Sequence, residues 1–277
     1  MMKHRYITVA ALLVFASCSA NHISPAFNGP TPLAVLIEEN PWLWVIGSDV
    51  PSVALYDDGL LIYHDATITN DFPFRSVRLQ TQELRELCES IGPTEEFDKL
   101  HPCFDLAGGF DLPSTKLYLS DGKTHKMISL YGTRIDDGHL LVCDNSTNIV
   151  APKEFVRVQT LLSGLSYKDA DPWIPEYYEI MIWPYDYAPN QRNWPDTFPS
   201  LKDRLTLQRK KGAYSLYIQG SRKAELAEFL SKSRDKEAVV IDGRKWAVSV
   251  RPVFPNEPLW RAAEKEYENV IPKGNGM

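Results

Sequence analysis

Residues 171–199, DPWIPEYYEIMIWPYDYAPNQRNWPDTFP, decide how the rest of the chain is divided. The stretch holds eight aromatic residues and six prolines. Prolines interrupt regular structure, and buried aromatic rings supply large contact areas between packed units. Because segments with the same order of expected elements lie on both sides, we predict that 171–199 is the connector and packing seam of a two-part body.

The segment before this connector is predicted to fold as hairpin, helix, hairpin, helix. Apolar runs at 52–63 and 116–131 are each interrupted by an Asp-Gly pair, a strong signal for a tight β-hairpin because glycine accepts a positive φ. Apolar residues in 81–91 have the i, i+3, i+4, i+7 spacing of a helix, and a Gly-Pro pair follows them. A second helix is expected to begin at Pro152 and to end before Gly164.

The segment after the connector repeats this order. Hairpins are predicted at 203–219 and 239–251, around a Lys-Gly and an Asp-Gly pair, and helices are expected to follow from Ser221 and from Pro258. The predicted fold class is therefore α+β, with two similarly ordered hairpin-helix-hairpin units whose antiparallel sheet is covered by helices. The predicted division is a signal peptide at 1–17, a tether at 18–32, an N-terminal unit at 33–170, the connector at 171–199 and a C-terminal unit at 200–277.

The N-terminus has the composition of an export signal. Basic residues at 3–5 precede an apolar run at 7–15, which is too short to span a bilayer because spanning takes about 20 apolar residues. The end of this run and the next three residues resemble the lipobox of bacterial lipoproteins, Phe15-Ala16-Ser17-Cys18. The resemblance implies that Cys18 becomes a lipidated N-terminus and that the membrane is a partner through this anchor.

The same resemblance predicts where the protein is located. Similar lipoproteins with serine after the modified cysteine, as Ser19 is here, are usually sent to the outer membrane of Gram-negative cells and face the periplasm. We therefore expect an exported protein that is anchored in the cell envelope. Ordinary cleavage after Ala20 is the alternative, and it predicts a soluble secreted or periplasmic protein.

Four short pieces of the first unit carry a second resemblance. They are similar to turn and strand features of uncharacterised domains of unknown function in bacterial lipoproteins and secreted proteins. In chain order the pieces are Leu55–Gly59, Asp111–Thr115, Asp121–Lys123 and Leu130–Gly132. This resemblance implies no activity.

The charge of the chain is unevenly distributed. The formal net charge is −6, yet residues 18–200 carry 12 basic and 26 acidic groups, whereas residues 201–251 carry 13 basic and 6 acidic groups. Overall acidity excludes the dominant basic footprint of nucleic-acid binders. The basic segment is interpreted as solvated side chains that also attract the acidic half of the molecule.

Three cysteines remain if Cys18 carries lipid. Exported proteins form disulfides, and a bridge between Cys88 and Cys103 would contribute about 3 kcal/mol in the chain-entropy model. The alternative is that Cys88, Cys103 and Cys143 are buried thiols that behave as small apolar residues.

Short catalytic and cofactor motifs are absent from the sequence. It contains no P-loop, no dinucleotide-binding glycine pattern, no G-x-S-x-G, no H-E-x-x-H, no C-x-x-C and no EF-hand loop. Asp136, His139 and Cys143 lie close together in the sequence, but a polar turn before a strand explains them without chemistry. We therefore predict no catalytic residue, no metal and no cofactor.

The aromatic residues of the connector are the remaining candidates for binding. Exposed Trp and Tyr rings on an exported protein can stack on sugars or contact a partner protein. The four residues selected for this role are Trp183, Tyr185, Tyr187 and Trp194. The alternative, which we favour, is that these rings fill the seam between the two units.

Together these features predict a membrane-anchored envelope lipoprotein of bacteria that binds or scaffolds a partner and catalyses no reaction. The expected partner besides the membrane is an envelope protein or a glycan. Two alternatives stay open at this point. One is a carbohydrate- or peptidoglycan-binding protein that uses the aromatic stretch, and the other is an exported hydrolase whose residues come from distant positions.

Overall fold

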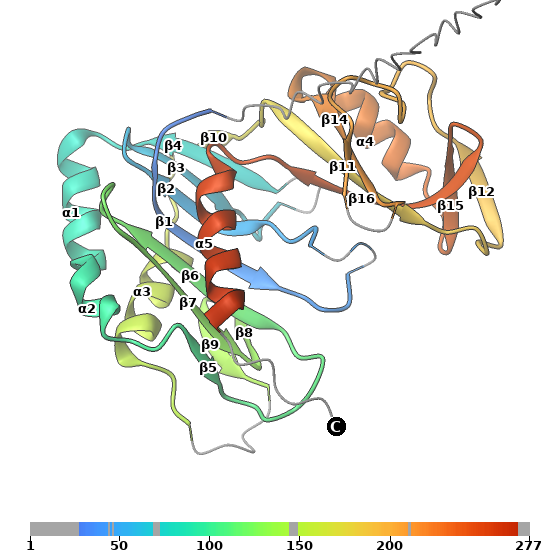
Figure 1. Ribbon diagram of the computed structural model, residues 1–277. Helices are drawn as coiled ribbons and strands as arrows, with labels where there is room; N and C mark the ends of the chain where they lie inside the picture. Colours follow the sequence, from blue (N-terminus) through green and yellow to red (C-terminus); the bar gives the residue numbers. More distant parts are fainter. Residues whose placement is uncertain are drawn as a thin grey trace, which may run out of the picture.

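Strands dominate the protein and form two large sheets and one small one (Figure 1). The structure, a computed structural model, describes residues 28–43, 45, 47–68, 73–143, 149–209 and 212–270. Within these residues no helix is long and apolar enough to span a membrane.

The first large sheet has eight strands in the order β10-β4-β3-β2-β1-β6-β7-β5, and only the β5–β7 pair is parallel. It is built by almost the whole first half of the chain, and β10 adds two residues from the start of the predicted connector. The strands are β1 (Pro32–Glu39), β2 (Pro51–Tyr56), β3 (Leu60–His64), β4 (Phe74–Arg78), β5 (Cys103–Asp105), β6 (Ser114–Ser120), β7 (His125–Tyr131) and β10 (Asp171–Pro172).

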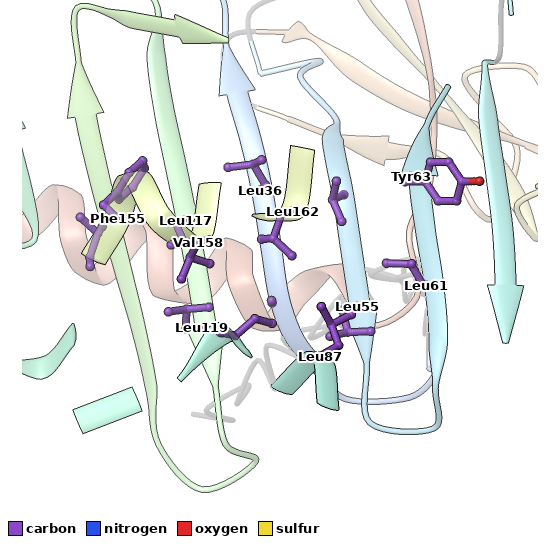
Figure 2. Packing of buried hydrophobic residues seen from close by; sticks show 14 of the residues in the cluster. Leu36, Leu55, Leu61, Tyr63, Leu87, Leu117, Leu119, Phe155, Val158 and Leu162 are labelled. Carbon is purple, nitrogen blue, oxygen red and sulfur yellow. The ribbon is translucent and has the colours of Figure 1, made fainter. Parts of the chain in front are cut away.

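Three helices cover one face of this sheet, namely α1 (Thr81–Ile91), α2 (Thr94–Asp98) and α3 (Lys153–Ser163). Alternate strand residues point toward them, because successive side chains of a strand face opposite ways. Figure 2 shows Leu36, Leu55 and Leu117 from the strands packed against Leu87 of α1 and Leu162 of α3. The intervening strand residues face the other side and form a separate core.

That second core is closed by the last helix, α5 (Glu257–Val270), which crosses the opposite face of the same sheet (Figure 1). Its Trp260 has no exposed surface and packs with Phe254 of the preceding loop. Val35 and Tyr56 of the sheet lie beneath them in the same cluster. The chain therefore leaves the first sheet, builds the second, and returns to the first.

The second large sheet has six strands in the order β12-β15-β16-β11-β14-β13, and only the β12–β15 pair is parallel. Helix α4 (Lys223–Ser231) packs on one face through Leu226, next to Trp194 and Trp246. A short 3₁₀ helix, η2 (Gly220–Arg222), leads into α4. The strands are β11 (Tyr177–Pro184), β12 (Asn190–Asn193), β13 (Leu207–Gln208), β14 (Tyr214–Gln219), β15 (Glu237–Ile241) and β16 (Arg244–Pro252).

The predicted α+β fold class, with two similar units of helix-covered sheet, is wrong. The protein is mostly β, with sixteen strands in three sheets among the described residues, and the third sheet is the hairpin of β8 (Thr133–Asp136) and β9 (His139–Val142). The two halves also differ in architecture. The first sheet is covered by helices on both faces, and one of these helices, α5, comes from the second half of the chain. Residues 177–184 of the predicted connector form β11, an interior strand of the second sheet.

Most of the predicted local elements are confirmed. The β2–β3, β6–β7 and β15–β16 pairs are antiparallel hairpins, and the glycine of each Asp-Gly turn has a positive φ between 77° and 85°. Helices α1, α3, α4 and α5 lie close to their predicted positions. Period and turn chemistry therefore identified the elements, whereas their assembly was missed.

Replacing Trp260 by Ala tests the return of α5. Removing a fully buried indole leaves a cavity, so we expect the free energy of unfolding to fall by about 3–5 kcal/mol. Urea denaturation measures this change. The neighbouring Leu259 is a matched control because it is partly exposed on the same helix, and Leu259→Ala is expected to cost less than about 1 kcal/mol. Equal losses in both variants would contradict the packing of α5.

Candidate functional site

A buried arginine lies where the second sheet meets α5. Arg251 of β16 contacts Glu179 of β11 at 2.5 Å and Glu257 of α5 at 2.6 Å. All three side chains are almost completely buried. Ser215 of β14 donates its hydroxyl to Glu179, so the carboxylate is held by β14 on one side and by the arginine of β16 on the other. A buried charge of this kind is tolerated only when it is paired and hydrogen-bonded.

The ion pairs continue along α5 to the first sheet. Arg261 donates to Glu257 at 3.1 Å and to Glu264 at 3.2 Å, and it also donates to the Asp49 backbone carbonyl at 3.0 Å. Glu264 in turn pairs with Lys116 of β6 at 2.6 Å. We call this chain, from Glu179 through Lys116, the elbow network. It links both large sheets through one helix.

Local geometry explains how these residues meet. In the register of the second sheet Glu179 lies directly opposite Arg251 on one side and Tyr217 on the other, so all three share one face. Glu257, Arg261 and Glu264 are spaced four and three residues apart, which places them on one side of α5. The network therefore follows from strand register and helix period once α5 has docked.

The surroundings set the protonation of these groups. Burial opposes the ionisation of Glu179, but Arg251, the Ser215 hydroxyl and Arg209 outweigh it and hold the pKa of Glu179 below its usual 4.5. Burial also opposes the charge on Arg251, yet Glu179 and Glu257 raise its pKa. Burial raises the pKa of the Tyr217 phenol, which keeps it protonated. Glu179 and Arg251 are thus charged at neutral pH.

A pocket of about 320 Å³ opens over this network. Its charged lining residues are all committed to ion pairs with one another. An arginine does not lose its proton in proteins, and Glu179, held ionised, is a poor general acid. The arrangement is better suited to holding β11, β16 and α5 together, or to binding a ligand, than to proton transfer. The full lining is Glu179, Tyr217, Arg251, Val253, Glu257, Pro258, Arg261 and Ala262.

The four aromatic residues predicted to bind a ligand are not brought together as one exposed row. Tyr187 is 85% exposed at a turn and Trp183 of β11 is 40% exposed, whereas Tyr185 and Trp194 are each 7% exposed. Tyr185 packs edge-on against Tyr187 at 4.9 Å. Trp194 lies in the core under α4 and donates its indole N–H to the Pro199 carbonyl.

The cysteines show no bridge in the described part of the chain. Cys88 of α1 and Cys103 of β5 are both free thiols, so of the two alternatives for this pair the structure shows the thiols and not the bridge. Cys88 is held on the helix face toward the first core, while Cys103 is fixed by the pairing of β5 with β7. Cys143 is an exposed free thiol, and Cys18 lies outside the described residues.

The described residues contain no group of three or more His, Cys, Asp or Glu side chains that could hold a metal ion. Asp136 and His139 face each other across the β8–β9 turn, as expected for a polar turn. No protein-family model matches the sequence, no curated protein matches it, and no solved structure matches the chain. Functional statements therefore depend on the residues themselves.

Sequence reasoning missed the elbow network because its members are far apart in the chain. Lys116 and Glu264, for example, are separated by 148 residues. One signal was available. Glu179 lies within the apolar run from Tyr178 to Ile182, and Lys116 lies within another predicted strand. Charged residues are rarely buried in strands unless they are paired. A charge in such a position indicates a buried partner.

The pKa of Glu179 predicts a pH dependence. A carboxyl with a lowered pKa in the folded state contributes stability that is complete above 4.5 and is lost as the pH falls through the folded-state value. Glu179→Gln removes one partner of a buried pair, so we expect a loss of about 3 kcal/mol at pH 7. The difference between wild type and variant, measured by urea denaturation, should shrink below pH 4.5.

This difference isolates Glu179, since Glu39 and Asp49 titrate in both proteins. Burial raises the pKa of both these carboxyls, so their contribution runs the opposite way and is greatest at low pH. A gap between the two proteins that stays constant from pH 7 to pH 3 would contradict the role of the Glu179 charge.

The positions of the connector aromatics predict unequal mutational effects. Trp194→Ala removes a core ring and a hydrogen bond, and we expect a loss of about 3–5 kcal/mol in the free energy of unfolding. Tyr187→Ala removes an exposed ring and should change stability by less than about 0.5 kcal/mol. Thermal and urea unfolding of both variants measure the contrast. A neutral Trp194→Ala would contradict the packing of Trp194 in the core under α4.

Proposed function

We propose that the protein is a lipid-anchored module of the bacterial cell envelope that binds or scaffolds a partner and catalyses no reaction. The observation that carries the proposal is the lipobox-like Phe15-Ala16-Ser17-Cys18, which ends only ten residues before the described body begins at Asn28. One acyl chain holds a protein marginally, whereas the several chains implied by the resemblance suffice without other membrane contacts.

The way the chain enters the body supports a tethered arrangement. Asn256, just before α5, donates from its side-chain amide to the Gly29 and Pro30 carbonyls. A Cβ on Gly29 would lie 2.6 Å from Pro255, so only glycine passes at this point without displacing the neighbour. Ten residues span at most about 35 Å. Cys18 therefore holds the body close to the bilayer.

The site geometry supports binding rather than catalysis. The charged side chains around the elbow pocket neutralise one another, and Glu179 and Arg251 are kept in their ionised forms. General acid–base chemistry needs a group with a pKa near the working pH. The network instead holds the two sheets in one orientation, which suits a rigid scaffold that presents surfaces to a partner.

Replacing Cys18 by Ala tests the anchor. We expect the wild-type protein in the membrane fraction and labelled by an alkyne fatty acid, and the variant in the soluble fraction and unlabelled, because the acylated thiol is gone. Cys143→Ala is the matched control, since it removes an exposed cysteine from the body and should leave fractionation unchanged. A Cys18→Ala variant that stays acylated and membrane-bound would contradict the proposal.

A further inference from the structure

The loop between β5 and β6, residues 106–113, presents a large apolar side chain to solvent. Phe110 at its tip is 92% exposed, the highest value among the large hydrophobic residues of the described chain. Exposing a whole phenyl ring gains nothing for folding. Single exposed apolar residues are common on protein surfaces, so the ring matters only if the loop around it is specifically built.

Hydrogen bonds hold the loop on both sides of its tip. The Tyr131 hydroxyl at the end of β7 accepts from the Leu112 N–H and donates to the Gly109 carbonyl, each at 3.1 Å. Asp105 at the end of β5 accepts from the Gly108 N–H at 3.0 Å. The backbone on either side of Phe110 is therefore tied to two strands of the first sheet, and the ring is held out on a rigid support.

A second exposed ring is fixed beside the first. Trp42, in the loop between β1 and β2, is 73% exposed, and its indole N–H donates to the Asp111 carbonyl at 3.0 Å. Its backbone N–H is held by the Asn40 side chain. A rigid aromatic side chain that is already ordered loses little entropy when a partner covers it, which is the property of interface hot spots. We call Trp42 and Phe110, with the loops that carry them, the aromatic loop pair.

The charge around the pair indicates the chemistry of its occupant. Asp105 and Asp111 are exposed on either side of Phe110, and the segment from 18 to 200 carries 26 acidic groups against 12 basic ones. Carboxylates beside the ring disfavour an anionic bilayer surface. A basic surface complements them, because opposite charges steer association and fix orientation.

The aromatic loop pair lies at the end of β1 opposite to the tether entry. Gly29 and Pro30 enter the body at the first residue of β1, whereas Asn40 and Trp42 follow its last residue. The eight residues of β1 separate the two ends by about 25 Å. The aromatic loop pair therefore lies about one strand length away from the point where the proposed tether joins the body.

We propose that the aromatic loop pair is the docking surface for an envelope protein whose apolar pocket accepts the Phe110 ring and whose rim carries lysine or arginine. The inference rests on the proposed binding function and adds the surface and the class of partner. Trp42 covers one side of the inserted ring, and Asp111 meets the basic rim. Tyr131 acts as a positioning residue, because its hydroxyl holds the loop at Gly109 and Leu112.

The first part of the test is photocrosslinking of the full-length protein in the cells that produce it, with p-benzoylphenylalanine placed at Phe110. The matched control carries the same group at Lys123, an exposed turn residue between β6 and β7. We expect a discrete protein adduct from position 110 and none from position 123. Absence of a protein adduct, or an adduct with lipid alone, overturns the proposal in favour of no partner or of the membrane.

The adduct by itself is not sufficient, so the identified protein is purified and its affinity for the full-length protein is measured. Phe110→Ala should weaken binding at least about 30-fold, as hot-spot residues do. Tyr131→Phe keeps the ring but removes the hydroxyl that bonds to the loop. Because the loop is then less ordered, we expect the affinity for the partner to fall about 3- to 10-fold. Both variants should retain the wild-type circular dichroism spectrum.

Tyr187→Ala is the control for affinity, because it removes another highly exposed ring, in the turn between β11 and β12 of the second sheet. Its binding should stay within about 2-fold of wild type. A Phe110→Ala loss below about 3-fold, or an equal loss in Tyr187→Ala, overturns the proposal. The two proposals can fail separately. Membrane fractionation of Cys18→Ala tests the anchor, whereas the affinity of the Phe110 variant for the purified partner tests the docking surface.

Discussion

The return of α5 to the first sheet is the constraint on which the rest of the structure depends. A sheet with apolar residues on both faces must be covered on both, and the first half of the chain supplies helices for only one face. Trp260 and Phe254 close the other face from the end of the sequence. In the sequence, the second sheet therefore lies between the strands of the first sheet and α5, the helix that covers the first sheet. This order forces the two sheets to meet at one elbow.

The elbow network is the polar consequence of this arrangement. Docking α5 brings Glu257 against β16 of the second sheet and Arg261 against the Asp49 carbonyl in the loop before β2, where isolated charges would be costly. Each charge is matched by a neighbour, and the chain of pairs ends at Lys116 in the first sheet. Such a network contributes little net stability compared with apolar packing, but breaking it is expensive, so it specifies one orientation of the two sheets.

A rigid body of this kind makes sense of the surface features. The tether entry and the aromatic loop pair lie at opposite ends of β1, so one strand sets the distance between the tether entry and the proposed docking surface. The braces at Tyr131 hold Phe110 outward without any partner present. An anchored scaffold needs this combination of a fixed spacing and an ordered contact residue, and it needs no proton-transferring group.

The sequence by itself determined the local elements, whereas the export signal stays a prediction from it. Asp-Gly pairs need positive φ, and apolar spacing near 3.6 needs a helix, so hairpins such as β6–β7 and helices such as α1 could be read from adjacent residues. Only the tertiary structure decided which faces those elements cover. The apolar stripe of α5 is equally compatible with its own sheet and with the first one, and the choice depends on the apolar residues left uncovered elsewhere. Tertiary structure also decided which residues contact Glu179. It decided that Tyr187 is exposed whereas Tyr185 is buried. Both outcomes depend on packing between segments that are far apart in the sequence, not on neighbouring residues.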